Sequence, residues 1–555
     1  MRLRQLIIAS LASGAIVKAS ELHVNLPVDS RSADQAPLRS PETTSENPFT
    51  KDFKDYVKQV MKDWKVPGMS IAVVDGDQVF AEGFGYASFP DKLASPETLY
   101  WVGSTTKAHL AATLAQLIDS GAHPELSRGW NTPISSIIRD DFVLKDDWAT
   151  AHLTLADAVS HRTGMTRHDA SWHKQVNGKN TTVKDVVRNL RNLPPLTFEP
   201  RTRWYYCNLM YVTLAHVVET VVGKWLGDVM KEVIWHPLGM KTTYLSLDEA
   251  LRVPVDIAKS YAWKEDTQEY IEMSQFPSLA ASGAGGIISN VVDYAKWLQC
   301  LIHEAEPFSA NVHKDIKTPR MILNPSPGLS GDMELYGLGW SRMTIHGAVA
   351  YEHGGSTLTF GAEVYWFPEL KYGLVAFANS DDTSNEVESI VLQRMIGDKL
   401  QVPLEKRPNV DKKLKESRKA NVQRLENAKD ILFPRRPEKP SPPSLEISQL
   451  AGSYMDSGYG LLRLAPMPHP RHTHETILVA NRTEFIFEHQ LQLHHVSGDY
   501  WIAYFVLPGE LKTQTKFFAS RFIFGADGQA SSLEIDLYDQ GTKVREGVVT
   551  FEKIN

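Results

Sequence analysis

Cysteine is almost absent from this sequence, which holds only Cys207 and Cys300 in 555 residues. A chain of this length can bury a core large enough to fold without disulfide bonds. Both cysteines lie in apolar surroundings or within a motif described below. We therefore expect two buried free thiols rather than a bridge.

Three further features are lacking, and each argues against a class of function. The formal net charge is −7, which argues against nucleic acid or an anionic membrane as the main partner, because both require a basic face. Beyond the N-terminus, no stretch approaches the roughly 20 apolar residues of a membrane span. The sequence contains no Gly-x-Ser-x-Gly, which disfavours the nucleophile elbow of an α/β-hydrolase.

The N-terminal residues predict export. Within residues 1–19, Arg2 and Arg4 precede the apolar run LIIASLASGAIV, and small residues follow it. This order is typical of a secretory signal peptide. Two sequons, at Asn180 and Asn481, are N-glycosylation acceptors if the host glycosylates. We therefore expect a secreted glycoprotein.

The remaining chain divides by composition. Residues 20–50 are polar and turn-rich, which predicts a leader rather than a domain. From residue 51, helical and strand-like segments alternate, with strands at the start and the end, which predicts an α+β domain whose sheet joins distant segments. We expect this domain at 51–402, a charged, solvated helix and a proline-rich connector at 403–443, and an antiparallel barrel or sandwich of short strands at 444–555.

A candidate nucleophile opens the apolar helical stretch AHLAATLAQLIDSG, in the tetrapeptide Ser104-Thr-Thr-Lys107. Residues three apart share a helix face, so the amino group of Lys107 is expected one turn from the hydroxyl of Ser104. Backbone N–H groups at the helix start and an adjacent lysine favour an activated serine. A second Ser-x-x-Lys, Ser171 to Lys174, precedes QVNGKNTT, which is typical of a polar surface loop. Ser104 is the stronger candidate.

Two further motifs follow along the chain. In an extended Tyr206-Cys-Asn208, the phenol and the amide project to the same side. A lysine beside a tyrosine favours the phenolate, so we expect Tyr206 to lose its proton more readily than usual. In His353-Gly-Gly355-Ser356, the glycines permit close approach of a strand edge to a ligand, and an N–H there can complete an oxyanion hole.

In this order, the three motifs resemble those of the serine β-lactamase and penicillin-binding-protein superfamily. The closest branch is that of class C β-lactamases, D-Ala-D-Ala carboxypeptidases and related esterases. Segments such as LTLADAVSHRTGM, HPLGMKTTYL and GAGGIISNVVDYAKW look like its framework. The resemblance covers about residues 51–400 and implies an α+β fold with an antiparallel sheet flanked by helices. Residues 444–555 are similar to the lipocalin-like β-barrel that some members append.

The resemblance implies roles for the motif residues. Ser104 would be the acylated nucleophile, and Lys107 and Tyr206 would share proton transfer, Tyr206 also serving the leaving group. Asn208 would hold the carbonyl or amide of the substrate and orient Lys107. The backbone N–H groups of Ser104 and Ser356 would form the oxyanion hole.

The third motif departs from the usual β-lactamase pattern. His353 and Gly355, which we expect to border the substrate, stand where β-lactamases usually carry Lys-Thr-Gly. A permanent cation is thereby lost, so an esterase or a D-amino-acid-type peptidase is favoured over β-lactam hydrolysis. Cys207 replaces a small Ser or Ala between Tyr206 and the asparagine. Arg201 replaces the glycine usual in a Phe-Glu-Pro-Gly turn.

The predicted function is that of a secreted serine hydrolase that acts on an ester, amide or peptide through an acyl-Ser104 intermediate, without metal or organic cofactor. Two alternatives stay open: an acyltransferase that uses the same intermediate, and a binding protein that kept the fold and lost catalysis. The appended β-domain is hypothesised to cap or narrow the site. A metal site is the weaker alternative, because its candidate ligands lie in a loop between strands: His469, His472, His474 and Glu475.

Overall fold

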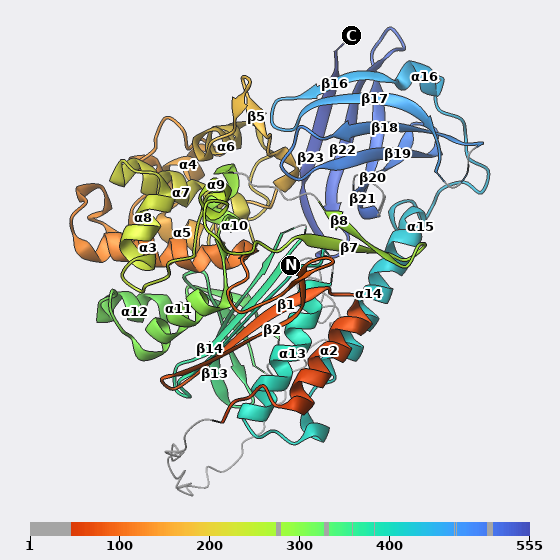
Figure 1. Ribbon diagram of the computed structural model, residues 1–555. Coiled ribbons are helices and arrows are strands. Elements are labelled where there is room, and N and C mark those ends of the chain that lie inside the picture. The colour runs from red at the N-terminus through yellow and green to blue at the C-terminus, as the bar shows by residue number, and fades with distance from the viewer. Residues whose placement is uncertain are drawn as a thin grey trace, which may run out of the picture.

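The computed structural model describes residues 46–273, 279–326, 332–357, 359–381, 383–470, 472, 474–507 and 514–554. The predicted signal peptide at 1–19 and the part of the predicted leader at 20–45 lie outside the described residues. The chain forms a sheet-and-helix body and a β-barrel, which a charged helix connects (Figure 1).

A nine-stranded antiparallel sheet is the centre of the first body, with the order β10-β11-β12-β13-β14-β15-β1-β2-β3. β1 (Gly68–Asp75) and β2 (Gln78–Ser88) form the hairpin that the sequence predicts. β1 also pairs with β15 (Tyr372–Ala378), so the prediction of a sheet that joins distant segments is confirmed. The other strands are β3 (Lys92–Leu93), β10 (Met321–Asn324), β11 (Glu334–Tyr336), β12 (Ser341–Ile345), β13 (Ala348–Ser356) and β14 (Gly361–Phe367).

Helices cover both faces of this sheet because its central strands are apolar on both sides. Successive side chains of a strand point to opposite faces. Ile71 and Val73 of β1 therefore pack with α2 (Lys51–Trp64) and α13 (Ser384–Lys399) on one face. Ala72 belongs to the core on the other face, which it shares with the helical region.

The helical region on the second face supplies most of the candidate site. Its longest helices are α3 (Thr106–Ser120), α7 (Asn208–Val222) and α11 (Val291–His303), and most of their residues are buried. Shorter elements complete it: α4 (Asp147–His152), α5 (Leu155–Val159), α6 (Val183–Asn189), α8 (Leu226–Met230), α9 (Leu247–Ala250), α10 (Ser282–Gly285), α12 (Ala310–Lys317), β4 (Tyr100–Trp101), β5 (Gln175–Val176), β6 (Lys179–Asn180), β7 (Ser260–Lys264), β8 (Glu269–Met273) and β9 (Ile288–Ser289).

The C-terminal residues form a closed antiparallel barrel, which decides between the predicted barrel and sandwich. Closure occurs where β16 (Gly452–Asp456) pairs with β23 (Val544–Lys553). The strands between them are β17 (Gly460–Pro468), β18 (Thr476–Arg482), β19 (His489–Ser497), β20 (Tyr500–Val506), β21 (Gln514–Phe524) and β22 (Ala530–Asp539); the short helix α16 (Ile447–Leu450) precedes them.

The connecting helix α14 (Val410–Glu426) is less solvated than the sequence predicts. Val410 and Leu414, four residues apart and hence on one helix face, are buried in the core that α2 and α13 share. Trp64 of α2 also donates a hydrogen bond from Nε1 to Asp411 at 2.8 Å. These contacts attach α14 to the first body before the chain continues through α15 (Ala428–Leu432) to the barrel.

The barrel contacts the loop at residues 166–173, which follows α5. The backbone N–H of Ile486 donates to the carbonyl of Trp172 at 2.8 Å. The hydroxyl of Tyr459 lies 2.7 Å from Nδ1 of His168 in the buried interface. The same loop borders the candidate site, so the barrel and the site share one structural element.

Candidate active site

Ser104 lies in the turn Gly103–Thr105, and Lys107 follows in the first turn of α3. The Nζ atom of Lys107 lies 3.0 Å from Oγ of Ser104 and donates to the carbonyl of Ala284 at 2.5 Å. The side chain of Lys107 is fully buried. Burial, reinforced by the positive charge of Arg167, lowers the pKa of Lys107 well below its usual value. A neutral amine in this place can accept the proton of Ser104.

Tyr206 approaches the same oxygen from the extended segment before α7. Its hydroxyl donates to Oγ of Ser104 at 2.7 Å, and its ring centroid lies 4.8 Å from Nζ of Lys107. The predicted readiness of Tyr206 to ionise is wrong in direction. Burial outweighs both the hydrogen bond to Ser104 and the charge of Arg167, so the pKa of Tyr206 is raised. Tyr206 is therefore a proton donor in the resting site.

An ion pair that sequence reasoning missed lies beside these groups. Nη2 of Arg167 lies 2.6 Å from Oδ2 of Asp169, and Cζ of Arg167 lies 5.2 Å from the centroid of the Tyr206 ring. Nδ2 of Asn208, at the start of α7, lies 3.3 Å from both carboxylate oxygens of Asp169. Opposite charges two residues apart are common in loops, so no sequence signal could have singled out this pair.

His161 and Cys207 hold the backbone around Tyr206. Nδ1 of His161 accepts the N–H of Cys207 at 3.1 Å, and the His161 ring lies 4.4 Å from that of Tyr206. The thiol of Cys207 donates to the carbonyl of Thr166 at 3.2 Å, and burial raises its pKa to about 12. At neutral pH the thiol is therefore protonated, and its role is packing.

Strand β13 brings Ser356 to the nucleophile. At Gly103, whose φ is 51°, an added Cβ would lie 2.7 Å from the backbone nitrogen of Ser356. At Gly355, an added Cβ would lie 2.0 Å from the carbonyl oxygen of Val102. Both glycines are therefore required where the two segments meet. This close approach places the backbone nitrogen of Ser356 beside the turn that carries Ser104, as an oxyanion hole requires.

His353 is placed differently from Asn208 and Ser356, two of the other residues expected to bind substrate. Its side chain is only 5% exposed. Nε2 lies 3.2 Å from the hydroxyl of Tyr336, and Nδ1 lies 2.7 Å from the carbonyl of Gly354. Asn208 and Ser356, in contrast, line the cavity at Ser104. The geometry thus gives His353 hydrogen-bonding partners within the protein, at Tyr336 and Gly354.

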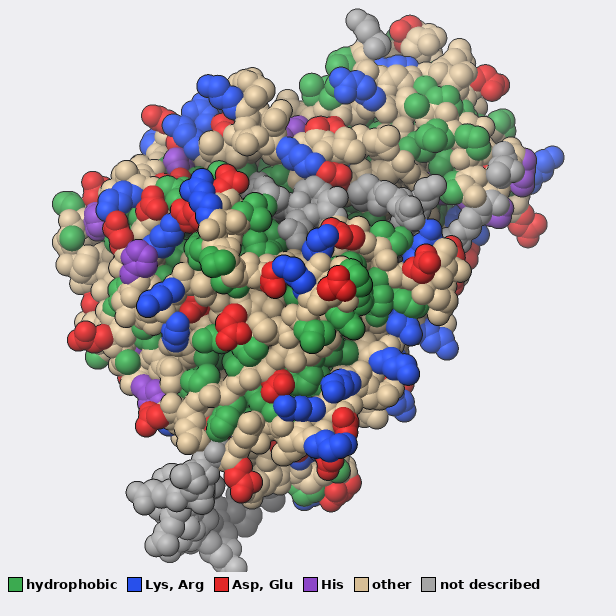
Figure 2. Space-filling model, viewed as in Figure 1, with side chains coloured by type: hydrophobic (Ala, Val, Ile, Leu, Met, Phe, Trp, Pro, Cys, Tyr) green, Lys and Arg blue, Asp and Glu red, His purple; other side chains and the backbone are tan. Residues whose placement is uncertain are grey.

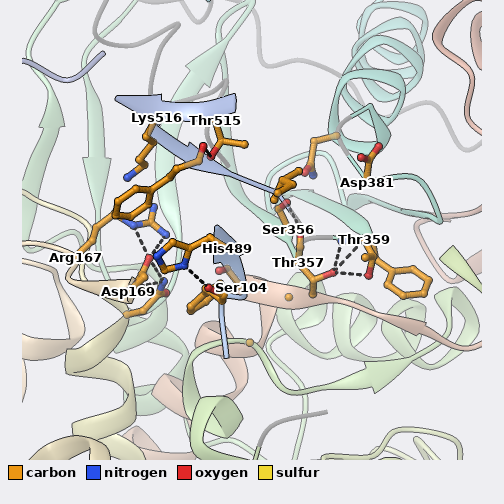
Figure 3. Close-up of a pocket in the computed structure, with 18 of the residues that line it drawn as sticks. Ser104, Arg167, Asp169, Ser356, Thr357, Thr359, Asp381, His489, Thr515 and Lys516 are labelled. Atoms are coloured by element: carbon orange, nitrogen blue, oxygen red, sulfur yellow. Dashed lines mark hydrogen bonds and ion pairs between the residues drawn. The ribbon is translucent and has the colours of Figure 1, made fainter. Parts of the chain in front are cut away.

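The cavity at Ser104 has a volume of about 1190 Å³ and lies between the first body, α14 and the barrel. Figure 3 shows Ser104, Arg167 and Asp169 together with His489 and Lys516 of the barrel around this space. On the outer surface, basic and acidic side chains are interspersed over the face shown in Figure 2. This face thus agrees with the modest net charge of the sequence.

Other predicted sites lie away from this cavity or at its edge. Asn180 and Asn481 are both exposed, so each is accessible as a glycosylation acceptor. Among the described residues, no group of three or more His, Cys, Asp and Glu side chains is placed to hold a metal ion, although the rings of His469 and His472 lie 4.8 Å apart. No helix within the described ranges is long and apolar enough to cross a membrane.

The family model of the β-lactamases matches residues 53–394, which carry all three motifs. The chain belongs to the β-lactamase family. It is 33% identical over 493 residues to an unguisins hydrolase of Aspergillus campestris, covering 88% of this chain and 90% of that protein. It is also 24% identical over 300 residues to a D-aminopeptidase of Brucella ovis, covering 53% and 54% of the two chains.

A solved structure shares the overall fold of this β-lactamase-family protein. It is an octameric penicillin-binding protein homologue from Pyrococcus abyssi, with a TM-score of 0.55 and 20% sequence identity. The match covers 90% of this chain and 99% of the other. The predicted fold class, an antiparallel sheet flanked by helices with a C-terminal antiparallel barrel, is confirmed.

One departure from the usual β-lactamase pattern has a clear structural explanation. Arg201 has a φ of 72°, a conformation that favours glycine. Its guanidinium compensates by pairing with Asp157 at 2.8 Å. Asp157 is fully buried and also accepts a hydrogen bond from Arg162 at 2.8 Å. Arg201 therefore neutralises a buried carboxylate at the cost of a strained turn.

Proposed function

We propose that this β-lactamase-family protein is a secreted serine hydrolase that cleaves an amide or ester through an acyl-Ser104 intermediate. One observation carries the proposal. The Oγ atom of Ser104 lies 3.0 Å from a buried amine with a depressed pKa and accepts a hydrogen bond from a protonated phenol at 2.7 Å. A base and an acid thus meet at one nucleophile.

The acylation step follows from these positions. As Oγ of Ser104 attacks the carbonyl carbon, its proton passes to the neutral Nζ of Lys107. The negative charge that develops on the carbonyl oxygen is stabilised by the backbone N–H groups of Ser104 and Ser356. When the tetrahedral adduct collapses, the bond to the leaving group breaks and the hydroxyl of Tyr206 supplies the proton that the leaving amine or alcohol requires.

Hydrolysis of the ester intermediate completes the cycle. Water attacks the acyl carbon bound to Ser104, and the phenolate of Tyr206 accepts a proton from the water. As this second adduct collapses, the ammonium of Lys107 returns its proton to Oγ of Ser104 and the carboxylic acid is released, which leaves Lys107 neutral and Tyr206 protonated again. No metal or organic cofactor takes part in these steps.

Three considerations narrow the substrate and the location. The matched relatives include an unguisins hydrolase and a D-aminopeptidase, which supports a peptide or amide substrate. Histidine at position 353 supplies no permanent cation in the place of the β-lactamase lysine, which argues against a β-lactam as the natural substrate. The signal-like residues 1–19 and the exposed sequons at Asn180 and Asn481 support secretion with N-glycosylation.

The proposal is tested by exposing the protein to a fluorophosphonate probe and measuring intact mass. We expect one adduct on the wild type and none on Ser104→Ala. Ser136→Ala is the control, because Ser136 is exposed and lies outside the cavity at Ser104; this variant is expected to leave labelling unchanged. An adduct that persists on Ser104→Ala would contradict the assignment of the nucleophile. An unlabelled but folded wild type would favour a binding protein.

A further inference from the structure

The cavity at Ser104 continues across the domain boundary to the mouth of the barrel. Its volume of about 1190 Å³ exceeds the roughly 300–1,000 Å³ typical of small-ligand pockets. The barrel contributes apolar side chains from the end of β18 to the end of β20, including Phe487, Phe505 and Leu507. The continuous space that reaches the nucleophile is therefore larger than a single small acyl group requires, and it extends along α14 to Trp64 as well as to the barrel.

These three apolar side chains are only partly buried. The Phe505 ring stacks on the His489 ring at 4.5 Å and meets the Phe518 ring edge-on at 5.1 Å. Phe487 meets Trp172 of the first body edge-on at 5.7 Å. These contacts fix the rings while leaving part of their apolar surface on the cavity, which is the arrangement of a binding wall.

The barrel interior next to this wall is packed with buried side chains such as Leu462, Leu491 and Ile535. A cavity among them has a volume of about 20 Å³, which holds at most a water molecule. Phe505 lines both this small cavity and the cavity at Ser104. A bulky substrate side chain is therefore expected to rest against Phe487 and Phe505 and not in the small cavity.

We propose that the barrel mouth, formed by Phe487, Phe505 and Leu507, is an apolar subsite for a bulky aliphatic or aromatic side chain of the substrate. The inference rests on the proposed function, and it narrows the substrate to amides or esters with a large apolar group beside the bond that Ser104 attacks. Burial of that group against the two rings favours such substrates over small acyl compounds.

The test compares two fluorophosphonates, one with an ethyl chain and one with a decyl chain, on the full-length protein. The measured quantity is kinact/KI for labelling of Ser104. We expect the wild type to react at least about 10-fold faster with the decyl probe. In Phe505→Ala this decyl-to-ethyl ratio is expected to fall by about 10-fold, and in Phe487→Ala it falls in the same direction.

Tyr500→Ala is the matched control, because Tyr500 lies on the same strand as Phe505 and its side chain is 51% exposed. This variant is expected to keep the wild-type ratio. The subsite would be overturned by equal rates for both probes on the wild type, or by an unchanged decyl-to-ethyl ratio in folded Phe505→Ala and Phe487→Ala. In either case, labelling by the ethyl probe would still support the proposed hydrolase. Failure of both probes on the wild type would overturn both proposals.

Discussion

The Arg167–Asp169 ion pair is expected to set the pH range of acylation. Arg167 lowers the pKa values of both Lys107 and Tyr206, whereas Asp169 raises both. Activity requires a neutral Lys107, so the acid limb of the pH–rate profile follows the pKa of this amine. Removal of the positive charge in Arg167→Gln raises that pKa and moves the acid limb to higher pH. Removal of the negative charge in Asp169→Asn moves the limb to lower pH.

The size of the shift follows from the geometry. Cζ of Arg167 and Nζ of Lys107 lie 5.2 Å and 4.8 Å from the Tyr206 ring centroid, so the two charges are no more than about 10 Å apart. Two unit charges at about 10 Å interact by about 1.7 kcal/mol at an effective dielectric constant of about 20, which corresponds to about 1 pH unit. The carboxylate of Asp169 contacts the guanidinium at 2.6 Å and acts on Lys107 from nearly the same place with the opposite sign. We therefore expect a shift of about 1 pH unit for each variant, in opposite directions.

The assay is the rate of single-turnover acylation of Ser104 as a function of pH. Arg167→Lys, which keeps the charge, is expected to restore most of the wild-type profile. Arg394→Gln is the control, because Arg394 forms an exposed ion pair with Asp398 on α13 and is expected to leave the profile unchanged. Shifts in the same direction for Arg167→Gln and Asp169→Asn would refute the electrostatic reasoning, since structural disruption has no reason to reverse its sign.

Two further predictions concern local geometry. Gly103→Ala is expected to reduce kcat by about 100-fold or more, because the added Cβ would lie 2.7 Å from the backbone nitrogen of Ser356. Gly121→Ala is the control, because Gly121 has a similar φ of 63° but open space around it. Equal activity of the two variants would contradict the oxyanion assignment. Arg201→Gly is expected to lower the free energy of unfolding by about 1–3 kcal/mol in urea titrations, because relief of a strained φ is outweighed by weaker neutralisation of the buried Asp157. Against the opposing effect of burial, hydrogen bonds from Arg201 and Arg162 hold the pKa of Asp157 below its usual value. The difference in unfolding free energy between the wild type and Arg201→Gly is therefore complete near neutral pH and disappears as acid protonates the carboxyl. A difference that persists in acid would contradict the ion-pair explanation.

Local patterns predicted much of the fold because their physical causes act between neighbours along the chain. The turn at Asp75-Gly76 defines the β1–β2 hairpin, and alternation along residues 444–555 defines short strands. Pattern alone could not distinguish a barrel from a sandwich, because closure depends on β16 meeting β23 about 90 residues later along the chain. The buried face of α14 was also missed, since Val410 and Leu414 stand among many charged residues.

The sequence by itself determined the chemical groups of this site. Ser104 and Lys107 are one helical turn apart, and that spacing sets their meeting in space. Only the tertiary structure decided the protonation states of Lys107 and Tyr206. Desolvation and distant charges, which no local pattern contains, lower the pKa of Lys107 and raise that of Tyr206. The same long-range packing joins Arg167 to Tyr206 and extends the cavity to the barrel, because both depend on surfaces that only folding brings together.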